Sequence, residues 1–234
     1  MYYGFFTVNS KDQNPIDLVD KQALLLIDSH EVLVREDYSV DTVDLAPSMV
    51  GKYLFYRGKV LRITEVEAYR GVSDPGSHAY RSKTKRNAPM FGSPGHLYVY
   101  ISYGMHNCIN IVADTTSEAS GILIRSGEQV ALVQSGDQVP HLEPRVQNLD
   151  IRSGARGPGR LGRLVGAKLA DSGYDLCDVD AQIFLFQGRD DRFCEVGSSN
   201  RIGLGKGGEL PWRFFDQGSD QVSKPKAVAI SNLG

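Results

Sequence analysis

The sequence has few of the features that mark metal-binding, secreted or membrane proteins. Its 234 residues include only three cysteines, Cys108, Cys177 and Cys194, and no Cys-x-x-Cys or His-x-x-x-His pair. This spacing supports neither a disulfide framework nor a zinc site. The sequence shows no signal peptide and no apolar run of membrane-spanning length. We therefore expect an intracellular protein, in the cytoplasm (nucleoid) of a bacterium or the nucleus of a eukaryote.

The chain also lacks an excess of charge of either sign. It has 26 Lys and Arg against 28 Asp and Glu, a formal net charge of -2, which is not typical of proteins that bind nucleic acid through bulk charge. Basic residues do cluster at 81–86 and 152–163. A basic face is one interpretation of these clusters, and solvated loops are the other. No GxGxxG, Walker or GxSxG pattern occurs, which argues against nucleotide cofactors and serine hydrolases, so we expect no cofactor and no metal.

Strand patterns outnumber helix patterns along the chain. Two hairpins are expected, at 52–56 with 59–69 and at 96–102 with 107–112, and further strands at 121–125, 181–187, 201–204 and 212–215. Helices are expected at 24–27, from the Asp41 cap through Met49, and at 160–169. The sequence therefore predicts an α+β fold: a single domain built on a curved, mainly antiparallel sheet with a protruding β-hairpin and flanking helices. Residues 1–40 are expected to form an extension packed on the core, and 41–234 the main domain.

The strand expected at 59–69 carries the first candidate for chemistry. Glu65, Glu67 and Tyr69 alternate along it and so project from one face. A carboxylate can activate water, and a buried acid is costly unless it is paired or functional. A salt bridge from Glu67 to Arg125 is the structural alternative, and Glu65 is a competing candidate. Glu67 is favoured because it stands beside Tyr69.

Flat side chains near this acid could hold an aromatic heterocycle. Tyr69, Tyr100 and His78 are the candidates, since stacking on a base contributes about 1–3 kcal/mol. Core packing for the tyrosines and a solvated loop for His78 are the alternatives. Asn110 could test the edge of a bound ring, or it could make a cross-strand hydrogen bond.

The tip of the second hairpin carries Tyr103 and Met105, which are difficult to explain as packing. An exposed apolar wedge is unfavourable unless it inserts into a partner, and proteins that deform DNA insert such wedges between base steps. Residues 157–160 open the expected helix with Gly-Pro-Gly-Arg. Free backbone N–H groups there could hold a phosphate, although glycines are equally consistent with a plain turn.

Taken together, these segments resemble the alkyladenine (3-methylpurine) DNA glycosylase family. The resemblance covers about residues 41–223 and is carried by an ordered series of motifs: ITEVEAY at 63–69, TKRNAPMF at 84–91, PGHLYVYISYGM at 94–105, CINI at 108–111, IR at 124–125, GPGRL at 157–161, RIG at 201–203 and WRF at 212–214. His106 stands where the family often has an aromatic residue, Arg160 replaces a usual lysine, and 125–128 lacks the apolar-acid-proline run.

The resemblance implies a role for each candidate residue. Glu67 would activate the attacking water, with Arg125 near the water and the sugar backbone. Tyr69, His78 and Tyr100 would line the pocket for the base, and Asn110 would exclude the amino group of guanine. The residues that would contact DNA are Tyr103, which would insert into the duplex, and Met105, Arg86 and Arg160.

The favoured hypothesis is therefore a monomeric, monofunctional repair enzyme without lyase activity. It would flip 3-methyladenine and 7-methylguanine out of double-stranded DNA, hydrolyse the N-glycosidic bond and leave an abasic site. Hypoxanthine and etheno-adenine are further candidate substrates. One alternative is a non-catalytic binder of damaged or bent DNA. Another is an RNA-binding module that shares the sheet architecture.

Overall fold

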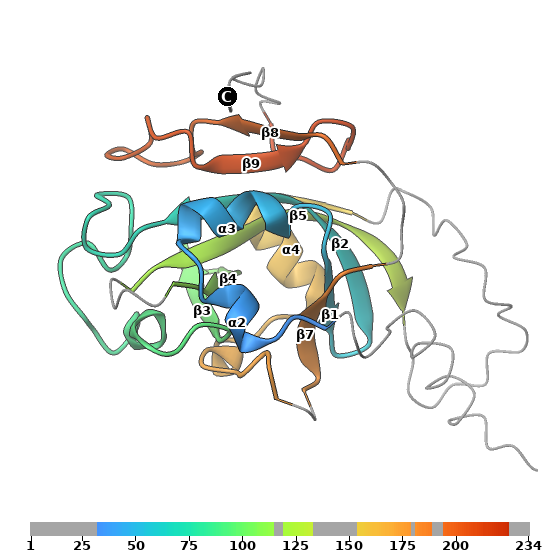
Figure 1. Ribbon diagram of the computed structural model, residues 1–234, viewed down its shortest axis with the longest axis horizontal. Helices are drawn as coiled ribbons and strands as arrows, with labels where there is room; N and C mark the ends of the chain where they lie inside the picture. Colours follow the sequence, from blue (N-terminus) through green and yellow to red (C-terminus); the bar gives the residue numbers. More distant parts are fainter. Residues whose placement is uncertain (1–31, 115–118, 133–153, 179–180, 189–193, 225–234) are drawn as a thin grey trace, which may run out of the picture.

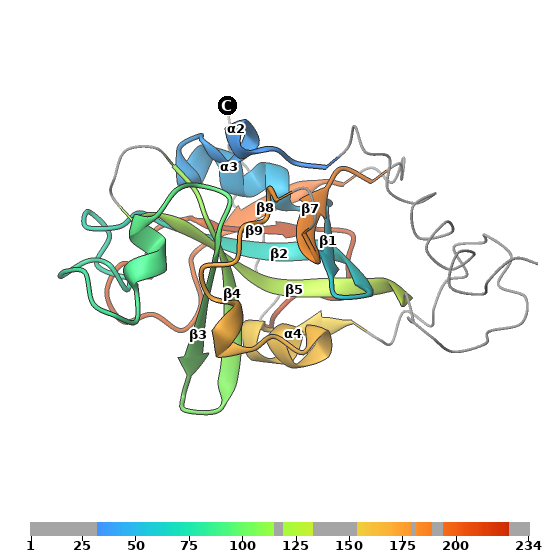
Figure 2. The same cartoon turned by 90° about the horizontal axis from the view of Figure 1, so that it is seen from below.

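One curled antiparallel sheet organises the chain in the computed structural model, which describes residues 32–114, 119–132, 154–178, 181–188 and 194–224. The sheet has nine strands with the main order β3-β4-β5-β2-β1-β7, and every pairing among the described residues is antiparallel. Helices α2 (Arg35–Tyr38) and α3 (Thr42–Met49) lie on one side of the sheet and α4 (Pro158–Val165) on the other (Figures 1 and 2). The predicted α+β class is confirmed.

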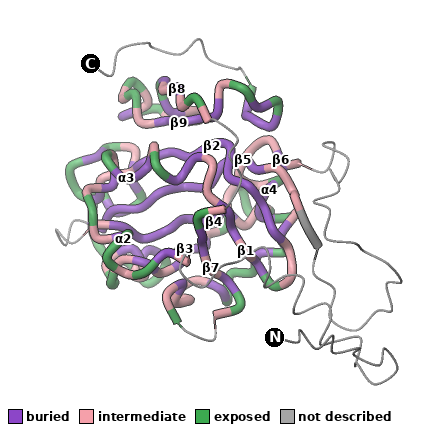
Figure 3. The backbone as a smooth tube through the Cα atoms, turned by 45° about the vertical axis from the view of Figure 1, so that its right-hand side comes forward, coloured by how far each residue is buried: buried purple, intermediate pink, exposed green. Residues whose placement is uncertain are grey.

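The central strand β2 (Lys59–Tyr69) brings the candidate acids into the interior. It pairs along its length with β5 (Gly121–Leu132), and on its other edge first with β1 (Tyr53–Tyr56) and then with β9 (Arg213–Asp216). Irregular register near Glu65 accompanies this change of partner. All residues from Val60 to Ala68 are buried (Figure 3). Acidic side chains on this stretch must therefore find partners inside the protein.

The hairpin of β3 (Leu97–Ser102) and β4 (His106–Val112) projects away from the body, as predicted (Figure 2). Its turn is closed by Met105 N–H donating to the Ser102 carbonyl at 3.1 Å. Tyr103 and Gly104 both have positive φ, 49° and 70°, within the three-residue connection between the paired residues Ser102 and His106. A tyrosine at positive φ is uncommon, and strained residues of this kind cluster at functional sites.

Helix α4 supports this hairpin near its tip through a close backbone contact with the start of β4. A Cβ at Gly162 would lie 1.8 Å from the Asn107 carbonyl oxygen, so only glycine allows the approach. The helix ends at Gly166, whose φ of 77° is the left-handed conformation typical of a helix C-terminus. The predicted helix at 160–169 was thus too long, since Gly166 terminates it and a separate 3-10 turn, Leu169–Asp171, follows.

Other predicted elements agree or differ in detail. The cap at Asp41, whose side chain accepts from Val43 N–H and Asp44 N–H, is confirmed. The prediction of a strand at 201–204 is wrong, because this segment is irregular. The Arg201 side chain is buried and forms an ion pair with Asp74 instead. The remaining elements are the 3-10 helix Ala88–Phe91 and strands β6 (Ala155–Arg156), β7 (Ile183–Phe186) and β8 (Val196–Ser199).

Part of the predicted N-terminal extension packs on the body. Val32 forms a β-bridge with Phe186, Leu33 N–H donates to the Leu185 carbonyl, and Tyr38 is fully buried. The boundary at residue 41 stays a prediction, and the helix predicted at 24–27 lies outside the described residues.

Candidate active site

Two carboxylates on β2 are joined by one guanidinium group. Arg125, on the neighbouring strand β5, donates from Nε to Glu65 Oε1 at 3.0 Å and from Nη1 to Glu67 Oε2 at 2.9 Å. Both glutamate side chains have no exposed surface. The predicted projection of residues 65 and 67 from one face is confirmed by this shared partner. The positive guanidinium compensates part of the charge that two buried carboxylates would otherwise carry unpaired.

Glu65 is fully engaged by donors from several parts of the chain. Besides Arg125, its Oε1 accepts from Arg213 Nε at 2.6 Å, and its Oε2 accepts from Ser126 Oγ at 2.6 Å and Ser223 N–H at 2.7 Å. Burial alone would raise the pKa of Glu65, but the charges of Arg125 and Arg213 and the Ser126 hydrogen bond outweigh it and lower the pKa below its ordinary value. A carboxylate with both oxygens doubly engaged functions as an anchor.

Glu67 accepts fewer hydrogen bonds. Its Oε2 accepts from Arg125 and from the Tyr69 hydroxyl at 2.8 Å, and its Oε1 accepts from Ile202 N–H at 2.7 Å. A carboxylate offers about four acceptor positions, so among the contacts of the described residues one position on Oε1 is left. The salt bridge to Arg125, considered above as the structural alternative, is present. It does not use up the carboxylate, and the predicted catalytic role of Glu67 stays a prediction.

An aromatic cluster forms around Tyr100 on β3. The His78 ring meets the Tyr100 ring edge-on with centroids 4.4 Å apart, and Tyr98 stacks on Tyr100 at 5.6 Å. Tyr98 hydroxyl and His78 Nδ1 are 3.1 Å apart. Burial raises the pKa of Tyr100 most, and Glu67 is among the groups that raise it further. Of the three predicted rings, His78 and Tyr100 meet here, whereas Tyr69 lies against the Arg201 guanidinium, and their role in binding a base stays a prediction. Tyr98 was expected on the same face as Tyr100 but was not among the site candidates.

The other predicted base and backbone contacts lie around this cluster. Asn110, on β4, donates from Nδ2 to the Tyr98 carbonyl at 3.0 Å, which is the cross-strand hydrogen bond considered above. Its role in excluding guanine stays a prediction. Arg86 lies with Cζ 5.4 Å from the Tyr100 ring centre and donates to the Ile101 carbonyl at 3.3 Å. Burial and the nearby Arg86 charge lower the pKa of His78.

The hairpin tip is the most exposed apolar part of the described chain. Tyr103 is 87% exposed and Met105 74%, and Ile101, which was not predicted, is 40% exposed on the same hairpin. Arg160 is also exposed, at the start of α4, where a Cβ on neighbouring Gly159 would contact His106. The two halves of the predicted DNA-binding surface, the hairpin and the helix start, are therefore adjacent in the structure.

Several residues of the site were not identified from the sequence. Arg213, Ser126 and Ser223 hold Glu65, and Ile202 contacts Glu67 only through its backbone. The motif at 212–214 placed Arg213 in the family pattern without indicating its partner. A backbone donor such as Ile202 N–H leaves no signal in side-chain type.

The described part of the chain holds no group of three or more His, Cys, Asp or Glu side chains placed to bind a metal ion. A separate search of the same residues found no helix of the length and apolarity needed to cross a bilayer.

Comparison with known proteins gives a consistent result. The model of the methylpurine-DNA glycosylase (MPG) family matches residues 36–220. A protein of Frankia casuarinae named "Putative 3-methyladenine DNA glycosylase" is 40% identical over 198 residues, which is 81% of this chain and 91% of that protein. Proteins with the same name in Streptomyces avermitilis and Burkholderia lata are each 38% identical, over 204 and 196 residues, with 83% of this chain and 92% of each relative covered.

Proposed function

The chain belongs to the methylpurine-DNA glycosylase family, and we propose that it removes alkylated purines from double-stranded DNA by hydrolysis assisted by Glu67. The proposed substrates are chiefly 3-methyladenine and 7-methylguanine. The proposed product is an abasic site in an uncut strand, released by a monomeric enzyme.

The remaining acceptor position on Glu67 Oε1 is the observation that carries this proposal. A water bound there would pass a proton to the carboxylate while its oxygen attacks the anomeric carbon of the sugar. The electrons of the broken glycosidic bond would go to the departing base. Glu65, which stands on the same face, has no acceptor position left for such a water among its contacts in the described residues. This difference favours Glu67 over Glu65 as the base.

The charge of the substrate explains why one free acid suffices. Glycosidic cleavage usually uses two carboxylates, one of which protonates the leaving group. A purine alkylated at N3 or N7 is already cationic, so it leaves as a neutral molecule without that proton. The faces of Tyr69 and Tyr100 would also favour a cationic ring over a neutral one. Hypoxanthine and etheno-adenine are neutral leaving groups, and we place them as secondary substrates.

Access to the base requires that it leave the helix, at a cost of a few kcal/mol. The exposed Tyr103 at the strained turn supports insertion into the vacated space, with Met105 beside it. Arg86 and Arg160 would contact phosphates on either side of the hairpin. Tyr69, His78 and Tyr100 would hold the base, and Asn110 would exclude the guanine amino group.

The test is the Glu67→Gln variant in single-turnover release of 7-methylguanine from methylated duplex DNA. The amide cannot take up the proton, so the excision rate should fall by about 10²–10⁴-fold. Affinity for duplex DNA with an abasic-site analogue should be retained. Glu36→Gln, at an exposed position of α2, is the control for the loss of a carboxylate and should behave as wild type.

Each rival hypothesis predicts a different result. Wild-type rates in the Glu67→Gln variant would show that another group activates the water. Tight binding without any base release by the wild type would favour the non-catalytic binder, and equal affinity for damaged and undamaged strands would favour the RNA-binding module. Because no lysine is among the proposed pocket residues, treatment with borohydride during the reaction should trap no covalent adduct with the DNA.

A further inference from the structure

A second buried ion pair, to which the proposed mechanism gives no role, lies next to the candidate site and joins the loop after β2 to the segment before β9. Arg201 binds both carboxylate oxygens of Asp74, with Nη1 2.6 Å from Oδ2 and Nη2 2.7 Å from Oδ1. Both side chains have no exposed surface. The other guanidinium N–H groups donate to the Ala68 carbonyl, at 2.8 Å, and to the Gly207 carbonyl, at 2.7 Å from Nη2 and 3.3 Å from Nε. Every donor of Arg201 is thus engaged, which fixes its orientation.

The surroundings of the guanidinium are shaped closely around it. Its Cζ lies 4.6 Å from the Tyr69 ring centre and 5.2 Å from that of Trp212. A Cβ at Gly76 would lie 2.7 Å from Arg201 Nη2, and one at Gly207 would lie 2.9 Å from the same atom. Two glycines therefore allow the backbone to approach a single arginine, and Gly207 also has the positive φ, 72°, that glycine favours.

Three segments meet at this pair, and each one leads to the candidate site. Asp74 Oδ1 accepts from Gly76 N–H and the Asp74 carbonyl accepts from Ser77 N–H, which holds the turn that carries His78. Arg201 immediately precedes Ile202, whose N–H donates to Glu67 Oε1. The Tyr69 ring against the guanidinium carries the hydroxyl that donates to Glu67 Oε2.

We propose that Asp74 and Arg201 are positioning residues for base excision. This inference rests on the function proposed above. The pair fixes Ile202 N–H and Tyr69, and it thereby sets the direction of the remaining acceptor position on Glu67 Oε1. It touches neither the substrate nor the water. Its loss would leave the acid in place but misdirected, and a displacement of about 1 Å can reduce a rate about 10²-fold.

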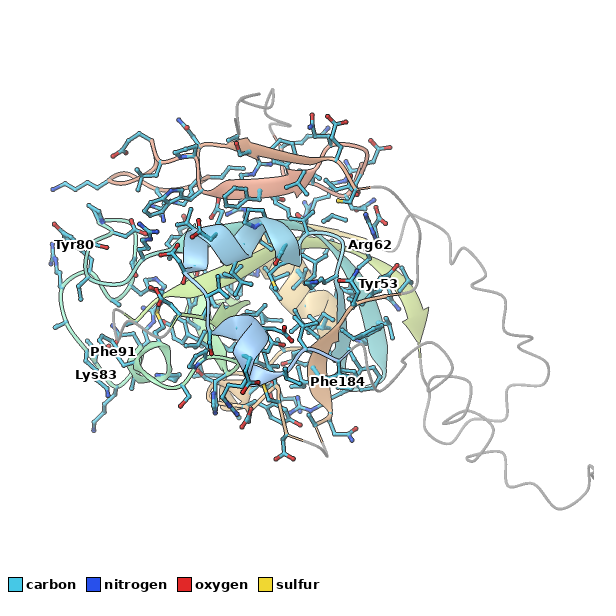
Figure 4. The ribbon with its side chains drawn as sticks, viewed as in Figure 1. Tyr53, Arg62, Tyr80, Lys83, Phe91 and Phe184 are labelled. Carbon is cyan, nitrogen blue, oxygen red and sulfur yellow. The ribbon has the colours of Figure 1, made fainter. Side chains whose placement is uncertain are left out.

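The experiment compares Asp74→Asn with Asp216→Asn as a matched control. Asp216 forms a similarly buried pair with Arg62, 2.8 Å between Nη1 and Oδ2. Arg62 lies across the molecule from Tyr80, which marks the loop that follows Asp74 (Figure 4). Single-turnover release of 7-methylguanine is measured at a temperature at which unfolding curves show every variant folded. Asp74→Asn should lower the rate constant by about 10²-fold, while Asp216→Asn should retain the wild-type rate.

Arg201→Lys is the second variant, for use also if Asp74→Asn does not fold. Lysine keeps the charge but cannot span both oxygens of Asp74 or stack between two rings, so it should also slow excision. Affinity for an abasic-analogue duplex should change by no more than about twofold, which separates positioning from binding.

The outcomes distinguish this inference from the proposed function. The positioning role would be overturned if Asp74→Asn, Asp216→Asn and the wild type had equal rates, or if the two variants lost activity equally. Either result would leave the proposed function intact as long as Glu67→Gln is still inactive. Full activity in Arg201→Lys would do the same. A Glu67→Gln variant with wild-type activity would overturn the proposed mechanism instead, and a wild-type protein that releases no base would overturn both.

Discussion

Glu65 and Glu67 are two residues apart on β2, face the same way and are both fully buried, yet their carboxylates have different partners. Glu65 accepts two hydrogen bonds on each oxygen. Glu67 accepts two on Oε2 and one on Oε1. Since a carboxylate has about four acceptor positions, Glu67 but not Glu65 can take another donor without losing a partner, as far as the described residues are concerned. Burial does not distinguish the two acids, whereas their hydrogen bonding does.

The origin of the partners sharpens this contrast. Glu65 is held by Arg125 and Ser126 of β5, by Arg213 of β9 and by the backbone at Ser223, so it joins strands on both edges of β2. Glu67 shares Arg125 but otherwise depends on Tyr69 of its own strand and on an irregular loop. Glu65, which the neighbouring strands hold in place, thus determines the position of Arg125. Arg125 in turn helps to orient Glu67.

The largest expected effect on stability is that of Glu65→Gln. Removal of the Glu65 charge takes from Arg213 the carboxylate that it binds and leaves Arg125 with Glu67 alone, and breaking a buried ion pair in this way typically costs about 3–5 kcal/mol. Urea unfolding at pH 7 should show a loss of this size. Glu67→Gln, which leaves Arg125 paired with Glu65, should cost clearly less. Equal losses in the two variants would show that the two acids are equivalent anchors.

The same comparison has a pH dependence. The pKa of Glu65 is lower in the folded protein than its ordinary value of 4.5, because Arg125 and Arg213 outweigh the burial that would raise it. A lowered folded pKa gives stability that is present above the unfolded pKa and lost as the pH falls through the folded pKa. The difference in unfolding free energy between wild type and Glu65→Gln should therefore be full at pH 7 and shrink below pH 4.5. A difference that grows on acidification would contradict this assignment.

A smaller effect, on binding alone, is expected at the hairpin tip. Tyr103 is 87% exposed, and a Cβ at neighbouring Gly104 would meet no atom within 4 Å. Tyr103→Ala should leave the free energy of unfolding within about 0.5 kcal/mol of wild type. It should weaken binding to abasic-analogue duplex DNA by about 1–3 kcal/mol, the range for stacking of an aromatic side chain on a base. Val34→Ala, at another exposed apolar position, is the control, and equal affinities in both variants would exclude insertion by Tyr103.

The sequence predicted the parts of the fold that depend on local pattern. Two strand-like runs separated by Arg57-Gly58 predicted the first hairpin, and the spacing of Glu65, Glu67 and Tyr69 placed them on one face of β2. The tip of the second hairpin was predicted at 103–106 and spans 103–105, because His106 already belongs to β4. These features depend on residues that are close in sequence and on the two-residue repeat of side-chain direction along a strand. Both can be read directly from the sequence.

Long-range polar contacts could not be predicted in the same way. The segment 201–204 has the apolar pattern of a strand, but Arg201 turns inward to Asp74, 127 positions earlier in the chain, and the segment stays irregular. Strand β8 has the sequence VGSS, with no alternation, and forms because β9 lies beside it. The difference between Glu65 and Glu67 likewise depends on Arg213, Ser223 and Ile202, which are distant in sequence.

Tyr69→Phe is the smallest change that tests the difference in role between Glu65 and Glu67. Burial and the Glu67 charge raise the pKa of Tyr69 well above its ordinary value, so the hydroxyl stays protonated and donates to Glu67 Oε2. Phenylalanine keeps the ring beside the Arg201 guanidinium but removes this donor, and one hydrogen bond to a charged group contributes about 1.5–3 kcal/mol. The excision rate should fall about tenfold, at the lower end of that range, because Arg125 and Ile202 still hold the carboxylate. Ser126→Ala, which removes one donor from Glu65 instead, is the matched variant and should lower stability with little effect on the rate. If Ser126→Ala slowed excision as much as Tyr69→Phe, the two carboxylates would act as one unit, and the division into an anchor and a base would be wrong.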